Sequence, residues 1–304
     1  MIRRHFAFAL AALLAAVFLG CKPSGTSSLP SGTAPTSGTP TTAYTLRVAG
    51  ADRSYLVHRP ANLPAGPRPL VMLLHGATDS AAYAFEAYHF VDKSDAEGFI
   101  LVAPDAMGDR RAWQAYDPNP NDDLTFLTTL LDNLERSYSI DKNRIYFAGH
   151  SAGAAMTYRF AAEHGDRVAA IGVVAGTVGT VDSGLTRADI PAPKYNIPLI
   201  AFHGNADPSL AIDSGRDAAA FWARAIGAGR LSSPKAIPGN EATIQTAHNT
   251  ATAAHVEFYE VIDGNHMWPG GKVMPGKTQD PVPAPDATGL IWDFFRTHPK
   301  LPSP

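Results

Sequence analysis

The residues best suited to chemistry are Gly-His-Ser-Ala-Gly at positions 149–153. They follow the apolar run 145–148 and precede the helix-prone run 154–160, so the pattern predicts strand, sharp turn and helix. In such a turn the serine has a strained backbone, and glycines two positions to either side leave room for it. The helix directs its free N–H groups towards the serine Oγ. We predict that Ser151 is a nucleophile; the alternative is a glycine turn with a bystander serine.

A serine hydroxyl is a weak nucleophile at neutral pH, so Ser151 needs a base, and that base needs an acid to fix its tautomer. When the serine turn follows a strand of an α/β sheet, the acid and then the histidine come later in the chain. We predict that the acid is Asp207, because it lies in the turn after the apolar run 199–202. Asp213 and Asp217 are neighbouring rivals, and an aspartate that only caps its own turn is the alternative.

The predicted base is His266, which lies in a glycine-rich loop directly after the last strand-like run. Such a loop lets an imidazole reach over the strand ends towards the serine. Three other histidines follow the acid in sequence: His248, His255 and His298. His255 would begin the strand and His298 would follow the last helix, so neither is well placed. A lone histidine is more often structural than catalytic, yet the order serine, acid, histidine favours His266.

Backbone N–H groups are expected to stabilise the negative charge that develops when an acyl group is attacked. In this type of site one comes from the residue after the nucleophile, here Ala152, and one from the loop after the first central strand. We assign the second donor to Ala77. His75, His150 and His203 lie beside these positions, and we expect them to pack and hydrogen-bond beneath the site rather than to act as bases.

The elements that position these residues are indicated by apolar runs. Runs without polar alternation are typical of strands buried on both faces, as in a parallel sheet covered by helices. They occupy residues 70–74, 99–102, 145–148, 171–174, 199–202 and 256–262. The β-prone segments 44–48 and 54–58 predict an opening antiparallel hairpin. Helices are predicted over 122–136, about 221–226 and about 290–295. We therefore predict an α/β domain with a mostly parallel central sheet, helices on both faces, and functional groups beyond the carboxyl ends of the strands.

The first 43 residues are predicted to lie outside this domain. Residues 1–20 are basic and then apolar, as in a signal peptide that ends before Cys21. We predict a lipoprotein-type signal in which Cys21 is lipidated; the alternative is a cysteine removed with the signal. Residues 21–43 are rich in Ser, Gly, Thr and Pro and predict a disordered tether, and 44–304 the catalytic domain. The protein is thus expected to be exported, as a cell-surface or periplasmic lipoprotein or in secreted form.

Charge and ligand patterns exclude several function classes. Removing the two arginines of the signal leaves 23 of the 25 basic residues against 28 acidic ones, a net charge near −5. This does not favour nucleic acid or an anionic surface as a partner, so membrane contact is expected only through the lipid anchor. No cluster has metal-ligand spacing and no loop has a phosphate-binding pattern, so neither metal nor cofactor is expected. The single cysteine leaves no intrachain disulfide.

Six segments together resemble the polyhydroxybutyrate depolymerase and feruloyl esterase-like group of α/β-hydrolases, similar to carbohydrate esterase family 1. They are 73–76, 98–105, 140–146, 149–153, 203–207 and 266–270. The resemblance runs from about Arg53 to Phe295. It implies an α/β-hydrolase fold and a serine carboxylic ester hydrolase that acts through Ser151, His266 and Asp207. It also implies an ester substrate, either small or linked to a polysaccharide: feruloyl or acetyl esters, or hydroxyalkanoate oligomers.

The chain departs from this group in two ways. Secreted relatives often carry cysteine where Ala77 stands, and no separate surface-binding domain follows the last predicted helix. We therefore expect soluble esters rather than crystalline polyester as substrates. Trp113 and Trp268 lie in loops near the strand ends, where they would either form an aromatic wall or pack internally. Two other functions stay open: a peptidase of the same fold, and a non-catalytic surface lipoprotein, which would have a broken triad.

Overall fold

The computed structural model describes residues 40–300 except 109 and 183–184. The predicted signal peptide, Cys21 and most of the predicted tether lie outside the described residues. The boundary placed at residue 43 is wrong, because strand β1 (Thr41–Val48) already includes Thr41, Thr42 and Ala43. These residues continue the antiparallel ladder with β2 (Ala51–His58), up to the pair Thr41 and His58. The ladder and the hydrogen bond from Thr41 Oγ1 to His58 Nδ1 (2.9 Å) hold a segment whose composition resembles a linker.

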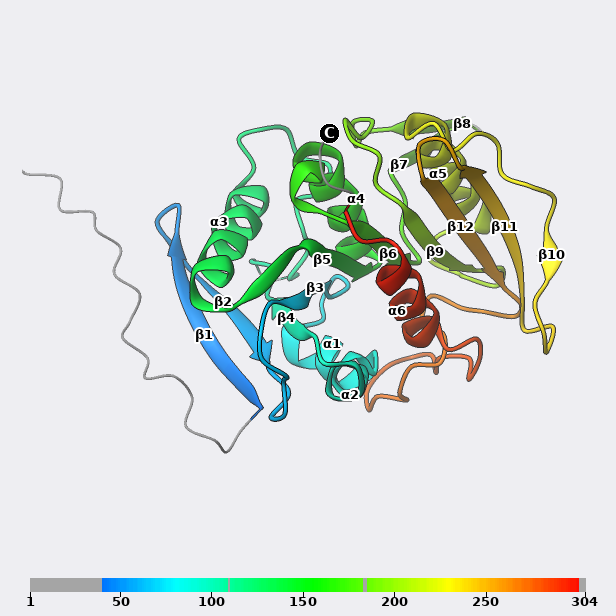
Figure 1. Ribbon diagram of the computed structural model, residues 1–304. Helices are drawn as coiled ribbons and strands as arrows, with labels where there is room; N and C mark the ends of the chain where they lie inside the picture. The colour runs from blue at the N-terminus through cyan, green and yellow to red at the C-terminus, as the bar shows by residue number, and fades with distance from the viewer. Residues whose placement is uncertain (1–39, 109, 183–184, 301–304) are drawn as a thin grey trace, which may run out of the picture. The chain divides into compact units, whose positions relative to one another are not determined.

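A ten-stranded sheet forms the centre of the described chain, and its middle is parallel (Figure 1). In sheet order the strands are β1, β2, β4 (Ile100–Pro104), β3 (Arg68–Leu74), β5 (Ile140–His150), β6 (Ala170–Val174), β9 (Leu199–Gly204), β12 (Ala254–Val261), β11 (Ala242–Asn249) and β10 (Lys235–Ala236). Neighbours from β4 to β12 are parallel, and the pairs outside them are antiparallel. A separate hairpin joins β7 (Gly179–Asp182) to β8 (Leu185–Ala188).

Helices cover both faces of this sheet, as predicted (Figure 1). The first face packs against α3 (Asp122–Ser137), α4 (Ala152–His164) and α5 (Ile212–Ala225). The second packs against α1 (Ala81–Ala87), α2 (Phe90–Glu97) and α6 (Ala287–Thr297). Successive side chains of a strand point to opposite faces. Within β3, Leu70, Met72 and Leu74 belong to the first core and Val71 and Leu73 to the second, so an unbroken apolar run serves both layers.

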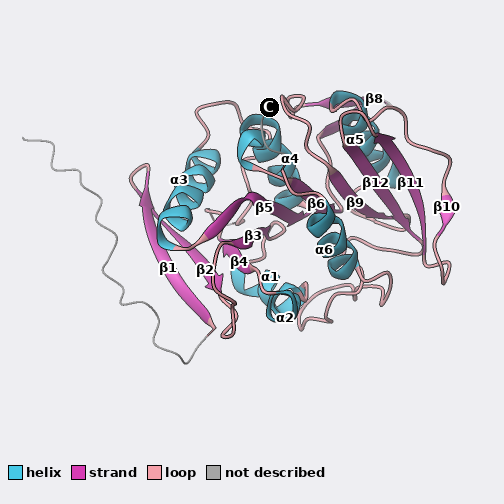
Figure 2. Cartoon of the chain, viewed as in Figure 1, coloured by secondary structure: helices cyan, strands magenta, loops and turns pink. Residues whose placement is uncertain are grey.

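Helices α3 and α6 each begin at a side-chain cap. Asn121 Oδ1 accepts a hydrogen bond from Leu124 N (3.0 Å), and two aspartates occupy the first turn of α3. Asp286 caps α6 in the same way through Gly289 N (2.9 Å). Figure 2 shows the chain alternating between helix and strand through the centre, whereas β10, β11 and β12 lie together at one edge. Among the described residues, no helix combines the length and apolar character needed to span a bilayer.

Candidate active site

Ser151 occupies the sharp turn between β5 and α4. Its backbone has φ 51° and ψ −116°, a strained conformation for a residue other than glycine. The Ser151 N–H donates to Val174 O (2.9 Å), which ties the turn to the neighbouring strand. A Cβ at Gly149 would lie 2.3 Å from Gly153 O, and one at Gly153 would lie 2.3 Å from Leu74 O. Only glycine fits at these two positions, because backbone atoms fill the space that a methyl group would need.

The structure brings Ser151, His266 and Asp207 into one hydrogen-bonded row. Ser151 Oγ lies 2.9 Å from His266 Nε2, and His266 Nδ1 lies 2.7 Å from Asp207 Oδ2. A carboxylate accepts and does not donate, so Nδ1 carries the proton and Nε2 accepts from the serine hydroxyl. The Asp207 side chain is fully buried, and 19% of the His266 side chain is exposed. This is the geometry in which an imidazole can take a proton from a serine.

Asp207 is held as a carboxylate by its surroundings. Its Oδ1 accepts hydrogen bonds from the N–H groups of Ser209 (2.8 Å) and Leu210 (3.0 Å). Burial alone would raise the pKa of Asp207. The hydrogen bonds from His266, Leu210 and Ser209 outweigh burial, so this pKa lies below its ordinary value. Its rivals Asp213 and Asp217 both lie on α5, and Asp213 is exposed and pairs with Arg216.

The three alternative histidines form a cluster of their own. His248 in β11 faces His255 in β12 across the strand pair, with ring centroids 4.9 Å apart. His298 caps the end of α6 and lies 2.9 Å from His255, measured between His255 Nδ1 and His298 Nε2. Besides one another they contact Phe294, and His255 Nε2 lies 3.5 Å from Glu257 Oε1. Of these four histidines, His266 is the one that contacts Ser151.

Ala77 and Ala152 lie where two strand ends meet. Ala77 is exposed in the loop after β3, and Ala152 is the first residue of α4, whose opening N–H groups have no acceptor within the helix. Strands β3 and β5 are parallel neighbours, so both loops leave the same edge of the sheet. The loop after β3 is fixed by Thr78, which has φ 67° and donates its N–H to Arg110 O (2.7 Å). Ala152 adjoins Ser151, and the loop that carries Ala77 leaves the sheet at the same edge, so both alanines remain candidate donors.

His75 and His203 are buried beneath the site and hydrogen-bonded to the backbone. His75 Nδ1 donates to Gly76 O (2.7 Å), and its Nε2 accepts from Ala106 N (3.1 Å). His203 Nε2 donates to Leu210 O (2.9 Å) and lies 3.4 Å from Asp207 Oδ2. Burial lowers the pKa of both imidazoles, against the backbone carbonyls that favour the charged form. These contacts agree with the structural interpretation, because each ring holds a loop of the site in place.

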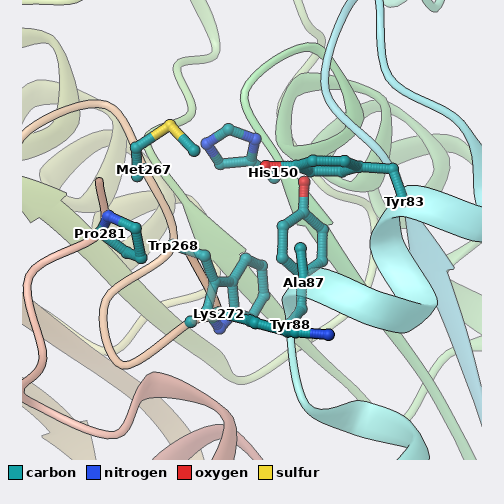
Figure 3. A pocket seen from close by; sticks show the side chains of 9 residues that line it. Tyr83, Ala87, Tyr88, His150, Met267, Trp268, Lys272 and Pro281 are labelled. Atoms are coloured by element: carbon teal, nitrogen blue, oxygen red, sulfur yellow. The ribbon is translucent and has the colours of Figure 1, made fainter. Parts of the chain in front are cut away.

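The two tryptophans also support loops from within. Trp113 is buried, and its Nε1 donates to His75 O (2.9 Å). Trp268 is buried as well, donates to Thr288 Oγ1 (3.0 Å) and stacks on Tyr88 with ring centroids 4.4 Å apart. Neither forms an exposed aromatic wall. A small surface pocket, with no room for a water molecule, lies beside the loop that carries Met267 and Trp268 (Figure 3). Its lining residues are Tyr83, Ala87, Tyr88, His150, Met267, Trp268, Gly271, Lys272 and Pro281.

Sequence analysis did not predict the contacts that hold in place the loop carrying His266, residues 262–286. Lys277 Nζ forms an ion pair with Asp79 in the loop after β3 and lies 4.3 Å from the centre of the Tyr83 ring. Asn265 Oδ1 accepts from Met267 N (2.9 Å), and its Nδ2 donates to Asp280 O (2.7 Å). An asparagine directly before the histidine is a turn signal that points to such a role. The Lys277 pair has no comparable signal, because its partners are 198 positions apart.

The sequence model of a protein family described as "Alpha/beta hydrolase family" matches residues 71–296, most of the described chain. The chain belongs to the alpha/beta hydrolase family. The sheet order, the covering helices and the serine turn agree with this assignment, and the predicted fold class is confirmed. In the described part of this hydrolase, no group of three or more His, Cys, Asp or Glu residues is arranged to hold a metal ion.

The hydrolase is similar to several curated esterases. It is 29% identical over 265 residues to "Putative esterase NocK" of Nocardia uniformis subsp. tsuyamanensis, covering 76% of this chain and 75% of the relative. It is 28% identical over 251 residues to "Probable feruloyl esterase C" of Aspergillus flavus, covering 80% and 84%. A shorter match, 32% over 126 residues, is to "Poly(3-hydroxyalkanoate) depolymerase C" of Paucimonas lemoignei, where it covers 39% of this chain and 30% of the relative.

Solved structures support the fold. An acetyl xylan esterase from Aspergillus awamori superposes with a TM-score of 0.64 over 84% of this chain and 99% of that one, at 16% identity. The named relatives and this neighbour are esterases, and we class the chain as an esterase of the alpha/beta hydrolase type. The resemblance to the depolymerase and feruloyl esterase group is confirmed.

Proposed function

We propose that this esterase hydrolyses carboxylic esters through an acyl-enzyme, with Ser151 as nucleophile, His266 as general base and Asp207 as the acid that orients the base. The observation that carries the proposal is the hydrogen-bonded row from Ser151 Oγ through His266 to Asp207, with distances of 2.9 and 2.7 Å. The serine has the strained turn conformation typical of such a nucleophile. The unbroken row argues against the non-catalytic alternative.

In the first half of the reaction, Ser151 Oγ attacks the ester carbonyl carbon while its proton passes to His266 Nε2. The carbonyl oxygen becomes an oxyanion, which accepts hydrogen bonds from the N–H groups of Ala77 and Ala152. When the intermediate collapses, the bond to the alcohol oxygen breaks and His266 returns the proton to the departing alcohol. Asp207 stays ionised and stabilises the imidazolium that forms in between.

The second half repeats these steps with water. His266 Nε2 accepts a proton from a water molecule, which attacks the acyl carbon attached to Ser151 Oγ. The acid product leaves when the bond to Oγ breaks and the serine recovers its proton from His266. Each proton that His266 takes is returned within the same half-reaction, so the base ends the cycle in the protonation state in which it began.

The proposed substrates are feruloyl or acetyl esters, free or attached to a polysaccharide, or soluble hydroxyalkanoate oligomers. The named relatives support this class, since they include a feruloyl esterase and a poly(3-hydroxyalkanoate) depolymerase. We further propose that the enzyme is exported and acts at the cell surface or in the periplasm, or after secretion. Its only proposed contact with the membrane is a lipid on Cys21, and no nucleic acid is involved.

Hydrolysis assays with purified variants test the catalytic assignment. Ser151→Ala and His266→Ala should each lower kcat by up to about 10⁶-fold, and the double variant by little more, because the pair acts as a unit. Wild type should hydrolyse members of a panel of p-nitrophenyl acyl esters, methyl ferulate, acetylated xylan and hydroxybutyrate oligomers. A fluorophosphonate probe should label wild type and not Ser151→Ala. Wild-type activity in Ser151→Ala, in protein free of other hydrolases, would overturn the assignment.

The anchor has its own test. Cys21→Ala should leave an uncleaved or mis-sorted precursor that carries no diacylglycerol, because lipidation requires the thiol. Mass spectrometry of the mature wild-type N-terminus checks this. A mature chain that begins elsewhere, or that carries no lipid, means that Cys21 is not the anchor, while the catalytic proposal stands.

A further inference from the structure

His150 directly precedes Ser151 in the chain, and its side chain contacts the backbone of His266. It is the last residue of β5, and its side chain is buried. Its Nε2 lies 2.6 Å from the backbone carbonyl oxygen of His266. Two adjacent residues therefore contact His266: the Ser151 hydroxyl meets the imidazole Nε2, and the His150 ring meets the peptide of the same residue.

The direction of the His150 hydrogen bond follows from its partner. A carbonyl oxygen only accepts, so His150 Nε2 carries the proton and donates. His150 Nδ1 is then unprotonated in the neutral ring; it is buried and has no hydrogen-bond partner among the described groups. It faces Gly76, where a Cβ would lie 2.8 Å away. Since Nε2 donates to the His266 carbonyl and Nδ1 has no hydrogen-bond partner, the geometry selects the neutral Nε2–H tautomer.

Aromatic packing holds the ring in this orientation. The Tyr88 ring meets His150 edge to face, with centroids 5.7 Å apart, and the Trp268 ring lies 6.5 Å away. Figure 3 shows His150 with Met267 on one side and Tyr83 on the other. The ring therefore has little freedom, and its N–H points at one fixed acceptor.

The His266 peptide benefits from a further support, because other contacts of its loop are made by the neighbouring residues Asn265 and Met267 and by Lys277. The residue lies between β12 and α6, in a segment with neither helix nor strand, and its side chain is partly exposed. Asp207 orients the imidazole, yet it does not fix the Cα from which the ring extends. A displacement of about 1 Å in a reacting group can cost about 10²-fold in rate. The hydrogen bond from His150, the last residue of β5, therefore fixes the position of the base relative to the nucleophile.

We propose that His150 is a positioning residue for the base: its Nε2–H holds the His266 peptide so that the imidazole stays within reach of Ser151. This inference rests on the proposed function, since it assigns a second partner to the proposed base. It differs from a packing role, in which any side chain of similar size would serve. The distinguishing feature is one N–H at one position.

Two amide variants form a matched pair. Glutamine places its amide nitrogen at the same number of bonds from Cβ as His150 Nε2, so His150→Gln keeps a donor towards His266 O. Asparagine places its amide at the position of Nδ1, facing Gly76, so His150→Asn keeps polarity and loses the donor. We expect His150→Gln to retain kcat within about 5-fold of wild type. His150→Asn should lose about 10- to 100-fold in kcat with KM changed less than about 3-fold.

The rate of fluorophosphonate labelling at Ser151 should fall in parallel with kcat in His150→Asn, and thermal unfolding of each variant checks that it is folded. Equal activity in the two variants, or a loss in KM alone, would overturn the positioning role. A measurement on wild type covers the case in which both variants unfold. Two-bond ¹H–¹⁵N spectra of histidine-labelled protein should show His150 as the neutral Nε2–H tautomer at pH 7, and an Nδ1–H tautomer or an imidazolium would overturn the proposal. If wild type fails to hydrolyse esters or to label at Ser151, the proposed function fails instead.

Discussion

Asp207 acts on His266 from a position that solvent does not reach. Its Oδ2 accepts from His266 Nδ1, and its Oδ1 is occupied by two backbone N–H groups. The carboxylate cannot rotate away without breaking all three bonds. At the scale of single residues, the site thus works by fixing tautomers: Asp207 keeps the proton of His266 on Nδ1, and Nε2 remains free to accept from Ser151.

Replacing this carboxylate by an amide should invert the tautomer. In Asp207→Asn the amide nitrogen faces His266 Nδ1 as a donor. The proton of the neutral imidazole then lies on Nε2, which can no longer accept from Ser151. We expect kcat to fall by about 10⁴-fold, less than for Ser151→Ala or His266→Ala. Asp213→Asn is the matched control, since Asp213 is exposed on α5, and it should stay within about 2-fold of wild type. Steady-state kinetics on a p-nitrophenyl ester decide this, and an equal loss in both variants would point to Asp213 or to general instability.

The pH dependence of activity should report the base rather than the acid. The pKa of Asp207 lies below its ordinary value, so this group stays ionised at mildly acidic pH. Protonated His266 cannot accept the serine proton, and kcat/KM should therefore decline as the pH falls. The fall in kcat/KM with decreasing pH should fit the uptake of one proton. A profile that is flat down to pH 4 would remove His266 from the role of base.

The site residues were accessible to sequence reasoning because a local pattern selects each one. Ser151 is marked by its flanking glycines, Asp207 and His266 by loops directly after apolar strands. The structure brings these three together. No local pattern marks the role of His150. Its partner is a backbone carbonyl 116 positions away, and because every residue has such a carbonyl, the sequence does not show which one accepts. Sequence alone therefore placed His150 beneath the site without revealing what it holds.

At the scale of elements, the junction of β5 and α4 sets how closely the nucleophile helix approaches β3. Gly153 lies in the first turn of α4, and the carbonyl oxygens of Leu74 and His75 lie 2.3 and 2.5 Å from the position that a Cβ on this residue would take. The helix can come this close only without a Cβ. This contact brings Ala152 N–H and the loop after β3 to the same place.

Gly153→Ala should therefore damage the junction. A methyl group against two backbone carbonyls forces α4 away from β3, and we expect a loss of about 3 kcal/mol or more in unfolding free energy, with a loss of fluorophosphonate labelling. Gly50→Ala is the matched control: it has nothing within 4 Å of the added methyl and only the strain of φ +81°. The control should cost about 1–2 kcal/mol and leave labelling intact. Denaturant unfolding of both variants measures the difference, and equal costs would contradict the packing argument.

Element prediction succeeded where burial dictates the pattern and failed where tertiary contacts do. The runs 70–74 and 199–202 are strands because nearly every side chain in them is buried. Strand β11 was missed, since Ala242–Asn249 is mostly polar and only partly buried. It is a strand because it pairs along its whole length with β12. The first residues of β1 and the short helices α1 and α2 are likewise stabilised by neighbours rather than by their own composition.

At the scale of the whole molecule, the distribution of histidines makes folding sensitive to acid. Burial is the largest cause that lowers the pKa of His75, His150, His164, His203, His255 and His298. For His150 this pKa falls to about 3, and for His255 to about 4. Each of these rings stays neutral in the fold at pH values where the same ring in the unfolded chain is charged.

The sign of the effect follows from proton binding. A folded pKa below the unfolded value means that the unfolded chain binds more protons, so stability is lost as the pH falls from about 6.5 towards the folded pKa. For fully buried His150, 1.5 pH units between 6.5 and 5 correspond to about 2 kcal/mol at about 1.36 kcal/mol per unit. Carboxylates with lowered pKa, such as Asp207 and Asp141, add a further loss only at lower pH, below about 4.

Denaturant unfolding at pH 7 and pH 5 should show this loss as at least about 2 kcal/mol, accompanied by proton uptake on unfolding. His255→Asn is the informative variant, because it lies in the cluster away from Ser151 and an asparagine amide keeps the donor that His255 Nδ1 offers to His298 Nε2. It removes a titrating ring and retains the hydrogen bond. We expect its loss between the two pH values to be smaller than that of wild type by about 1 kcal/mol, after discounting for the partial exposure of this ring. Stability that is equal at pH 7 and pH 5 in wild type would show that the buried histidines do not stay neutral in the fold.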